Sequence, residues 1–296
     1  MSIEQYTQLS FFAAPETNAD PREPITVTWN MHHGCNRVSP GCKYCYVFRR
    51  DAEYGIDTTK VHKTQAFNLP VRQYRTGEYK GLYKIPSGST IYACFSSDFF
   101  HPAADEWRDE LWAMIKERSD CTFFMITKRP ERIERSLPSD WGVGWENVHI
   151  SCTCENQWTA DHRLPIFLTL PLRHKSITHE PMLESINIRP YLSQYGKEIE
   201  SVSCGGESGP DARICDYGWV LNTHLQCVEY GVPFHFHQTG AKLRHHGKIY
   251  EIPRDQQHEQ ARKAGLDYGG GLEIPEYLQN CPVDGTSVRA TTFEQQ

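Results

Sequence analysis

The chain has 296 residues, of which 39% are hydrophobic and 12% aromatic, enough for a packed core in one large α/β domain or two small ones. Its formal net charge of −6 argues against a general nucleic-acid binder, whose phosphate contacts need a basic face, although a local basic patch stays open. Residues 1–14 lack the basic start and apolar run of a secretory signal, and no stretch approaches the ~20 apolar residues of a membrane helix. Together with eleven cysteines, these features lead us to expect a cytoplasmic protein with reduced thiols and no membrane partner.

Residues 1–24 are polar and show no helical or strand period, so we expect an N-terminal arm. Apolar, β-rich runs then alternate with helical segments as far as residue 240, with an aperiodic rim excursion over 55–90. The predicted strands are 25–29, 90–96, 122–127, 148–153, 174–179, 201–205 and 233–237. The predicted helices are 44–54, 104–118, 130–136, 156–163, 183–188 and 216–230.

This alternation predicts a parallel sheet, and six or seven such units predict an α/β fold of the partial (β/α)6–7 barrel kind. A doubly wound open sheet is the structural alternative. Residues 241–296 turn polar and Gly-rich, and we expect a C-terminal tail there.

Three cysteines, Cys35, Cys42 and Cys45, stand within one short run directly after the first predicted strand. Gly34 and Gly41 allow this run to turn tightly around a metal group. Three thiolates are one short of the four ligands of a four-iron cluster, so one iron would remain open to a small molecule.

The loop alone leaves two other interpretations open. The three cysteines with His32 or His33 can form a Cys3His zinc site, or they can be buried thiols without a ligand.

The tail of the loop, Cys42-Lys43-Tyr44-Cys45, resembles the cluster loop of radical S-adenosylmethionine (SAM) enzymes, which also prefer an aromatic residue before the last cysteine. Six residues separate Cys35 from Cys42, whereas that superfamily usually has three. This longer spacing is similar to that of a phage-associated radical-SAM-like family of unassigned function, itself distantly similar to the spore photoproduct lyases. Further motifs of that family stand in order at 97–101, 127–132, 154–156, 180–183, 205–209 and 237–240. Met31 and Thr239 depart from its usual Pro and Trp.

The resemblance implies an enzyme of the radical SAM type, with a [4Fe–4S] cluster on Cys35, Cys42 and Cys45 and SAM on the open iron. Such an enzyme cleaves SAM reductively to a 5′-deoxyadenosyl radical, with electrons from an external donor such as flavodoxin or ferredoxin. It implies a small-molecule or nucleotide substrate, and a DNA-linked substrate stays open by analogy. The alternative is a non-catalytic zinc- or cluster-binding interaction protein.

In a βα barrel the active residues gather where the strands end at their carboxyl side. The expected cofactor contacts are adenine with Tyr44, the SAM ammonium with Ser96, Ser97 and Asp98, ribose with Glu155 and Asn156, and an anion with the backbone at Gly205 and Gly206. The expected catalytic or substrate contacts are Lys128 and Arg129 with a carboxylate or phosphate, and Glu180 and Glu207 with polar groups. Packing, helix capping, solvated charge and ordinary hydrogen bonding are the structural alternatives for these residues. We expect Asp98, Glu180 and Glu207 to matter more for function than for folding.

Overall fold

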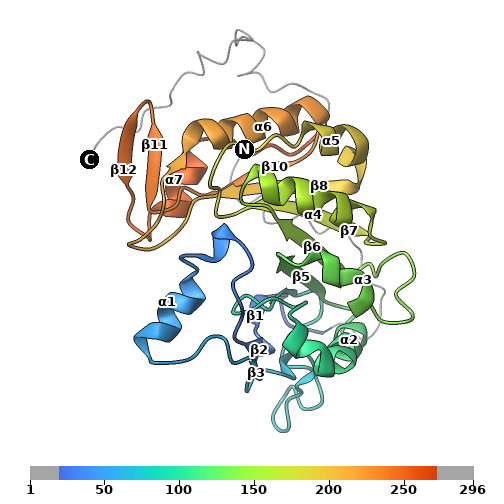
Figure 1. Cartoon of the computed structure of the whole chain (residues 1–296). Helices are drawn as coiled ribbons and strands as arrows, with labels where there is room; N and C mark the ends of the chain where they lie inside the picture. The colour runs from blue at the N-terminus through green and yellow to red at the C-terminus, as the bar shows by residue number, and fades with distance from the viewer. Residues whose placement is uncertain (1–19, 272–296) are drawn as a thin grey trace.

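The computed structural model describes residues 20–271. An α/β fold is confirmed: seven parallel strands form one sheet, curled into a half barrel, in the order β1-β4-β5-β6-β7-β8-β10 (Figure 1). The strands are β1 (Thr26–Trp29), β4 (Thr90–Ala93), β5 (Thr122–Thr127), β6 (Val148–Thr153), β7 (His174–His179), β8 (Ile199–Gly205) and β10 (Phe234–Gln238). Each of them lies beside the one that precedes it in the chain, whereas a doubly wound sheet reverses its strand order.

Helices follow the strands, and those after β4 to β8 cover the outer face of the sheet, whereas the helix after the cysteine loop stands apart from it (Figure 1). They are α1 (Tyr46–Glu53), α2 (Arg108–Glu117), α3 (Ile133–Ser136), α4 (Gln157–Thr169), α5 (Arg189–Tyr195), α6 (Tyr217–Tyr230) and α7 (Gln257–Lys263). The 3-10 turns η4 (Pro102–Trp107) and η5 (Pro130–Arg132) precede α2 and α3, so the helices expected over 104–118 and 130–136 each begin as a tighter turn.

The helix predicted over 183–188 is wrong. In this segment the backbone bonds to other parts of the chain: Leu183 N donates to Glu155 O, and the Gln226 side chain bonds Ile186 O and Ile188 N. The helix begins only at Arg189, with Pro190 in its first turn, where a missing N–H costs nothing.

The two faces of the sheet differ in polarity because side chains alternate along each strand. Ile150, Ile177 and Val202 are buried in the hydrophobic core against the helices. The other face carries rows of hydroxyl groups that bond across strands, such as Ser151 to Thr178 at 2.7 Å. Over β6, β7 and β8 the concave face of the half barrel is therefore hydrophilic, unlike the packed interior of a closed βα barrel.

Two segments outside the main sheet complete the described chain. The excursion after α1 holds β3 (His62–Lys63), which pairs with β2 (His32–His33), and the turn η3 (Leu69–Val71). The part expected as a C-terminal tail contributes β11 (Lys242–His245), β12 (Lys248–Glu251) and α7, and β11 also pairs with β9 (Cys215–Asp216). Residues 1–19 of the expected arm and 272–296 of the expected tail lie outside the described residues. None of the helices described has the length and apolar character needed to cross a membrane.

Candidate cysteine site

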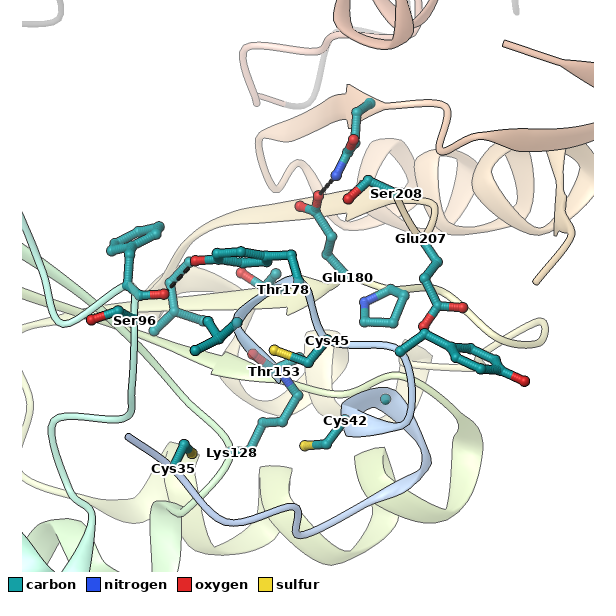
Figure 2. Close-up of a pocket in the computed structure, with 18 of the residues that line it drawn as sticks. Cys35, Cys42, Cys45, Ser96, Lys128, Thr153, Thr178, Glu180, Glu207 and Ser208 are labelled. Carbon is teal, nitrogen blue, oxygen red and sulfur yellow. Dashed lines mark hydrogen bonds between the residues drawn. The ribbon is translucent and has the colours of Figure 1, made fainter. Parts of the chain in front are cut away.

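A pocket of about 900 Å3 opens at the carboxyl ends of the strands (Figure 2). All seven strands of the main sheet contribute residues to it through their ends or the loops that follow. Of the residues singled out from the sequence, it gathers Cys35, Cys42, Cys45, Tyr44, Ser96, Ser97, Asp98, Lys128, Arg129, Glu180, Gly206 and Glu207. Glu155, Asn156 and Gly205 do not line it.

The three cysteines reach this pocket from one loop. Cys35 stands at the start of the loop, where its N–H donates to Thr58 O at 2.8 Å. Cys42 closes the 3-10 turn η2 (Pro40–Cys42), and Cys45 is the N-cap residue of α1. Figure 2 shows their side chains and that of Lys128 directed into the same part of the pocket.

Gly34, just before Cys35, has a φ of +101°, which favours glycine. A Cβ there would lie 2.7 Å from Lys60 O, so the loop can turn into the pocket only with glycine at this position.

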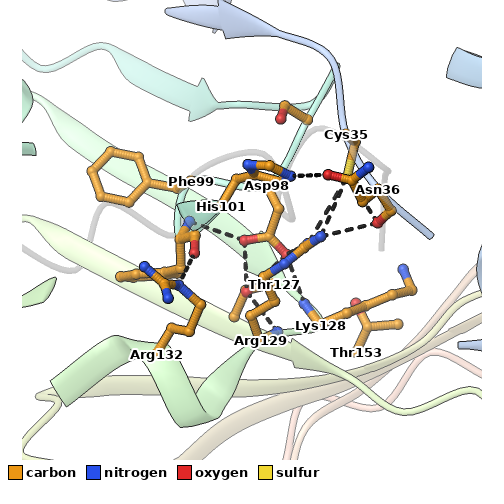
Figure 3. A network of polar contacts seen from close by, with 12 residues as sticks. Cys35, Asn36, Asp98, Phe99, His101, Thr127, Lys128, Arg129, Arg132 and Thr153 are labelled. Atoms are coloured by element: carbon orange, nitrogen blue, oxygen red, sulfur yellow. Dashed lines mark hydrogen bonds and ion pairs between the residues drawn. The ribbon is translucent and has the colours of Figure 1, made fainter. Parts of the chain in front are cut away.

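The first half of the cysteine loop is held at Asn36 (Figure 3). The Arg129 guanidinium donates to Asn36 O at 2.9 Å, and His101 Nε2 donates to Asn36 Oδ1 at 2.8 Å. The His101 ring carries its proton on Nε2, because Nδ1 accepts from Ala103 N. Burial and the nearby Arg129 lower the pKa of His101 to about 4, so the ring is neutral.

The second half of the loop is held by two acid–arginine pairs. Glu155 accepts from Gly41 N at 3.1 Å and pairs with Arg163 at 2.7 Å. Arg213 donates to Pro40 O at 3.0 Å and pairs with Glu207 at 2.7 Å. Side chains that follow several strands thus hold the six-residue segment between Cys35 and Cys42 in its conformation.

Asp98 is buried and has donors on both carboxylate oxygens (Figure 3). It accepts from the Thr127 hydroxyl at 2.8 Å, from Lys128 N at 3.1 Å and from Arg129 at 3.0 Å. Burial raises the pKa of Asp98, but the Arg129 charge and these hydrogen bonds more than offset it and leave the pKa below its ordinary value. Both carboxylate oxygens of Asp98 are therefore already used, and neither is free to accept from a SAM ammonium as expected. Arg129 was expected to hold a substrate anion, but its guanidinium is engaged in the ion pair with Asp98.

Several other expected contacts have structural partners. Asn156 is the N-cap of α4 and forms a capping box with Thr159, so its amide serves the helix. Gly206 N donates to Gln238 O at 3.1 Å and is not turned toward an anion. Gly206 is required by close packing, because a Cβ there would lie 2.8 Å from the backbone Cα of Gly240, and a Cβ on Gly205 would displace the Glu180 carboxyl. The Ser96 hydroxyl donates to His32 O at 3.3 Å, and that of Ser97 donates to Gly34 O.

The two expected acids differ in their surroundings. Glu180 faces the pocket, where its carboxylate accepts from His237 Nδ1 at 2.9 Å and from the Gln238 amide. Burial raises the pKa of Glu180, but these hydrogen bonds outweigh it, so the acid is ionised beside a histidine whose own pKa is raised by the same contact. Glu207 is occupied by Arg213 and supports the loop.

Two polar groups of the pocket stay available. Within residues 20–271 the Lys128 ammonium makes no hydrogen bond or ion pair, and it lines the pocket. Thr153, at the end of β6, is fully buried and its hydroxyl has no partner among the described residues. Such an orphaned polar group is expensive unless a ligand or water satisfies it, so the geometry makes Thr153 a candidate ligand contact.

The sequence did not single out Thr153, His101, Arg163 or Arg213. Thr153 and Arg213 stand just outside motif runs, at 154–156 and 205–209, and His101 lies inside the run 97–101. Arg163 sits in the helical segment after a run, with no local signal that its side chain turns back to Glu155. Their closeness to the motifs in the sequence is the one signal by which these four residues could have been found.

The spacing of the thiols bears on the metal. Zinc held tetrahedrally at ~2.3 Å from each sulfur places sulfurs about 3.8 Å apart. Among the described residues, the one group of three or more His, Cys, Asp or Glu ligands whose ligand atoms all lie within 4.8 Å of one another is His149, His174 and Glu200. The three loop sulfurs therefore do not all lie within 4.8 Å of one another.

The fold and the site define an α/β half-barrel protein with three cysteines in a pocket at the carboxyl ends of its strands. The chain belongs to the family described as "Protein of unknown function (DUF5131)", which matches residues 23–273. A comparison with curated proteins and another with solved structures each found no match.

Proposed function

We propose that this protein is a radical SAM enzyme. The observation that carries the proposal is the convergence of Cys35, Cys42 and Cys45 on one pocket formed by the ends of all seven parallel strands. The proposal includes the fold: the half barrel beneath the pocket, open on its hydrophilic face, is assigned to the radical SAM type.

The three thiols would hold the cluster, and the donor chemistry fits. Burial raises the pKa of Cys35, which makes a bare thiolate costly there, while the Arg129 guanidinium at 3.8 Å from its sulfur opposes that shift. A cluster iron would stabilise the Cys35 thiolate further, because thiols bound to a metal are deprotonated. Three cysteines leave one iron without a protein ligand.

The size of the whole pocket suits a cluster together with SAM, since about 900 Å3 is at the upper end of small-molecule sites. Within it Lys128 offers a cation to a carboxylate, Thr153 a hydroxyl, and Glu180 an ionised acid to an ammonium or a sugar hydroxyl. Tyr44 offers a ring face, although the Arg213 guanidinium already lies 5.3 Å from its centroid. When bound together, the cluster and SAM supply a reductively generated carbon radical.

The other parts of the proposal follow from this chemistry. It requires an external electron donor such as flavodoxin or ferredoxin, and reduced thiols, for which we propose a cytoplasmic location. The ten cysteines described are all free of disulfides. The substrate is proposed to be an anionic small molecule or nucleotide, attracted by Lys128. A nucleic acid would offer the same phosphate groups along a chain.

The test is to reconstitute the protein anaerobically and to measure iron, sulfide and zinc in wild type and in Cys35→Ala, Cys42→Ala and Cys45→Ala. We expect about four irons per chain in wild type and the loss of most iron in each variant. Cys227→Ala is the matched control, because this thiol is buried outside the pocket, and it should keep its iron. Stoichiometric zinc without iron would support a zinc-binding interaction protein, and iron retained in all three variants would refute the assignment of ligands.

A further inference from the structure

A second cluster of metal-ligating side chains lies on β6, β7 and β8, toward the amino ends of these strands and away from the cysteine pocket. His149 and His174 are register partners on the neighbouring strands β6 and β7. They stand on the same concave face as Ser151 and Thr178, because residues two apart along a strand share a face. Their rings stack with centroids 4.0 Å apart at 14°.

A bulge in β8 brings the third member, Glu200. Lys175 pairs with Ile199 and the next residue, Ser176, with Ser201, so Glu200 is the extra residue of an irregular register. Bulges of this kind redirect a side chain at a sheet edge or functional site. Here the Glu200 carboxylate lies 2.9 Å from His149 Nδ1 and also bonds His174 Nδ1.

The cluster is partly buried but open to solvent on one side. The His174 side chain is 7% exposed, that of His149 18% and that of Glu200 38%, so an ion can enter from the solvent side. Burial raises the pKa of Glu200, but the hydrogen bonds from His149 and His174 lower it to about 2, and the carboxylate is ionised at neutral pH. Glu146, in the loop before β6, lies 3.6 Å from His174 Nε2 on the other side of that ring.

We propose that His149, His174 and Glu200 form a binding site for one divalent transition-metal ion, for which Zn2+ is the best-suited probe. Two imidazoles and one carboxylate are the donor set of several zinc sites that keep a fourth position open for water. With each Nδ1 on the metal, the Glu146 carboxylate would lie 3.6 Å behind His174 Nε2, where its charge attracts the ring N–H, as carboxylates do behind zinc-bound histidines. The site does not depend on the cysteine pocket.

The test uses the full chain with Cys35→Ala, Cys42→Ala and Cys45→Ala combined, so that pocket thiols do not compete. Zn2+ titrated calorimetrically should bind at one site, and adding Glu200→Gln or His149→Ala should weaken it at least ~10-fold, since even indirect partners of a ligand cost that much. His235→Ala is the matched control, because His235 pairs with Asp267 at 3.0 Å outside the cluster, and the Zn2+ affinity should stay unchanged.

A second measurement uses the same chain without the three pocket cysteines. Co2+ bound by nitrogen and oxygen ligands gives weak visible bands without the intense near-ultraviolet absorption of thiolate ligands. We expect these bands in the triple-cysteine variant and their loss when Glu200→Gln is added, with circular dichroism showing that this chain is folded. Absence of Zn2+ binding, or affinity equal in Glu200→Gln and His235→Ala, would overturn the metal site and leave a hydrogen-bonded cluster.

Discussion

Replacing Asp98 by alanine should destabilise the protein strongly, although the sequence suggested a role mainly in function. Asp98 and Arg129 form an ion pair at 3.0 Å in which both side chains are 6% exposed. Removing one partner of such a buried pair leaves the other charge uncompensated, which costs about 3–5 kcal/mol. At ~2–4 °C of Tm per kcal/mol for a domain of this size, the Tm should fall by about 6–20 °C.

Thermal unfolding of wild type and Asp98→Ala, followed by circular dichroism, measures this effect. Asp140→Ala is the control, because Asp140 pairs with Lys116 in the open, where solvent screens the interaction and the Tm should change little. The pKa of Asp98 is lowered from 3.8, so its contribution should be fully present above about pH 4 and be lost as the pH falls through the lowered value. A Tm loss in Asp98→Ala no larger than in Asp140→Ala would refute the reasoning.

Three further predictions concern the pocket. Thr153→Val should keep or slightly raise the Tm, because it removes an unpaired buried hydroxyl, yet weaken SAM binding by ~2–10-fold, the cost of one hydrogen bond; equal SAM affinity in a binding titration would exclude the contact. Arg213→Ala should free Pro40 and reduce iron retention after desalting, whereas Arg244→Ala, which breaks the exposed pair with Asp216, should not; equal iron in both would show that Arg213 does not hold the loop. Lys128→Ala should weaken binding of SAM or of an anionic nucleotide and reduce the salt dependence of that binding; unchanged affinity at low and high salt would remove Lys128 from the site.

The sheet could be predicted from the sequence because its signal is local. The strands β5, β6 and β7 read as short apolar or β-branched runs, and their bounds agree with the prediction to the residue. The segment 183–188 misled because its backbone partners, Glu155 and Gln226, lie far away in the chain. A local pattern carries no information about such partners.

The location of the pocket was predictable for the same reason, since parallel strands bring their carboxyl ends together. The role of each charged residue was not. A sequence shows that Asp98, Arg129 and Glu155 stand at strand ends, but not that they pair with Arg129, Asp98 and Arg163 to fix the cysteine loop. Conversely, Thr153 looked like an ordinary strand residue, and only its missing partner in the folded chain marks it.

The central claim is tested most directly by incubating the reduced, anaerobically reconstituted protein with SAM and measuring 5′-deoxyadenosine by liquid chromatography. The proposal predicts product that depends on reductant and on the cluster, and its absence from Cys45→Ala treated in the same way. Iron-replete protein that forms no 5′-deoxyadenosine above the Cys45→Ala background, under reduction sufficient to reduce its cluster, would contradict the claim.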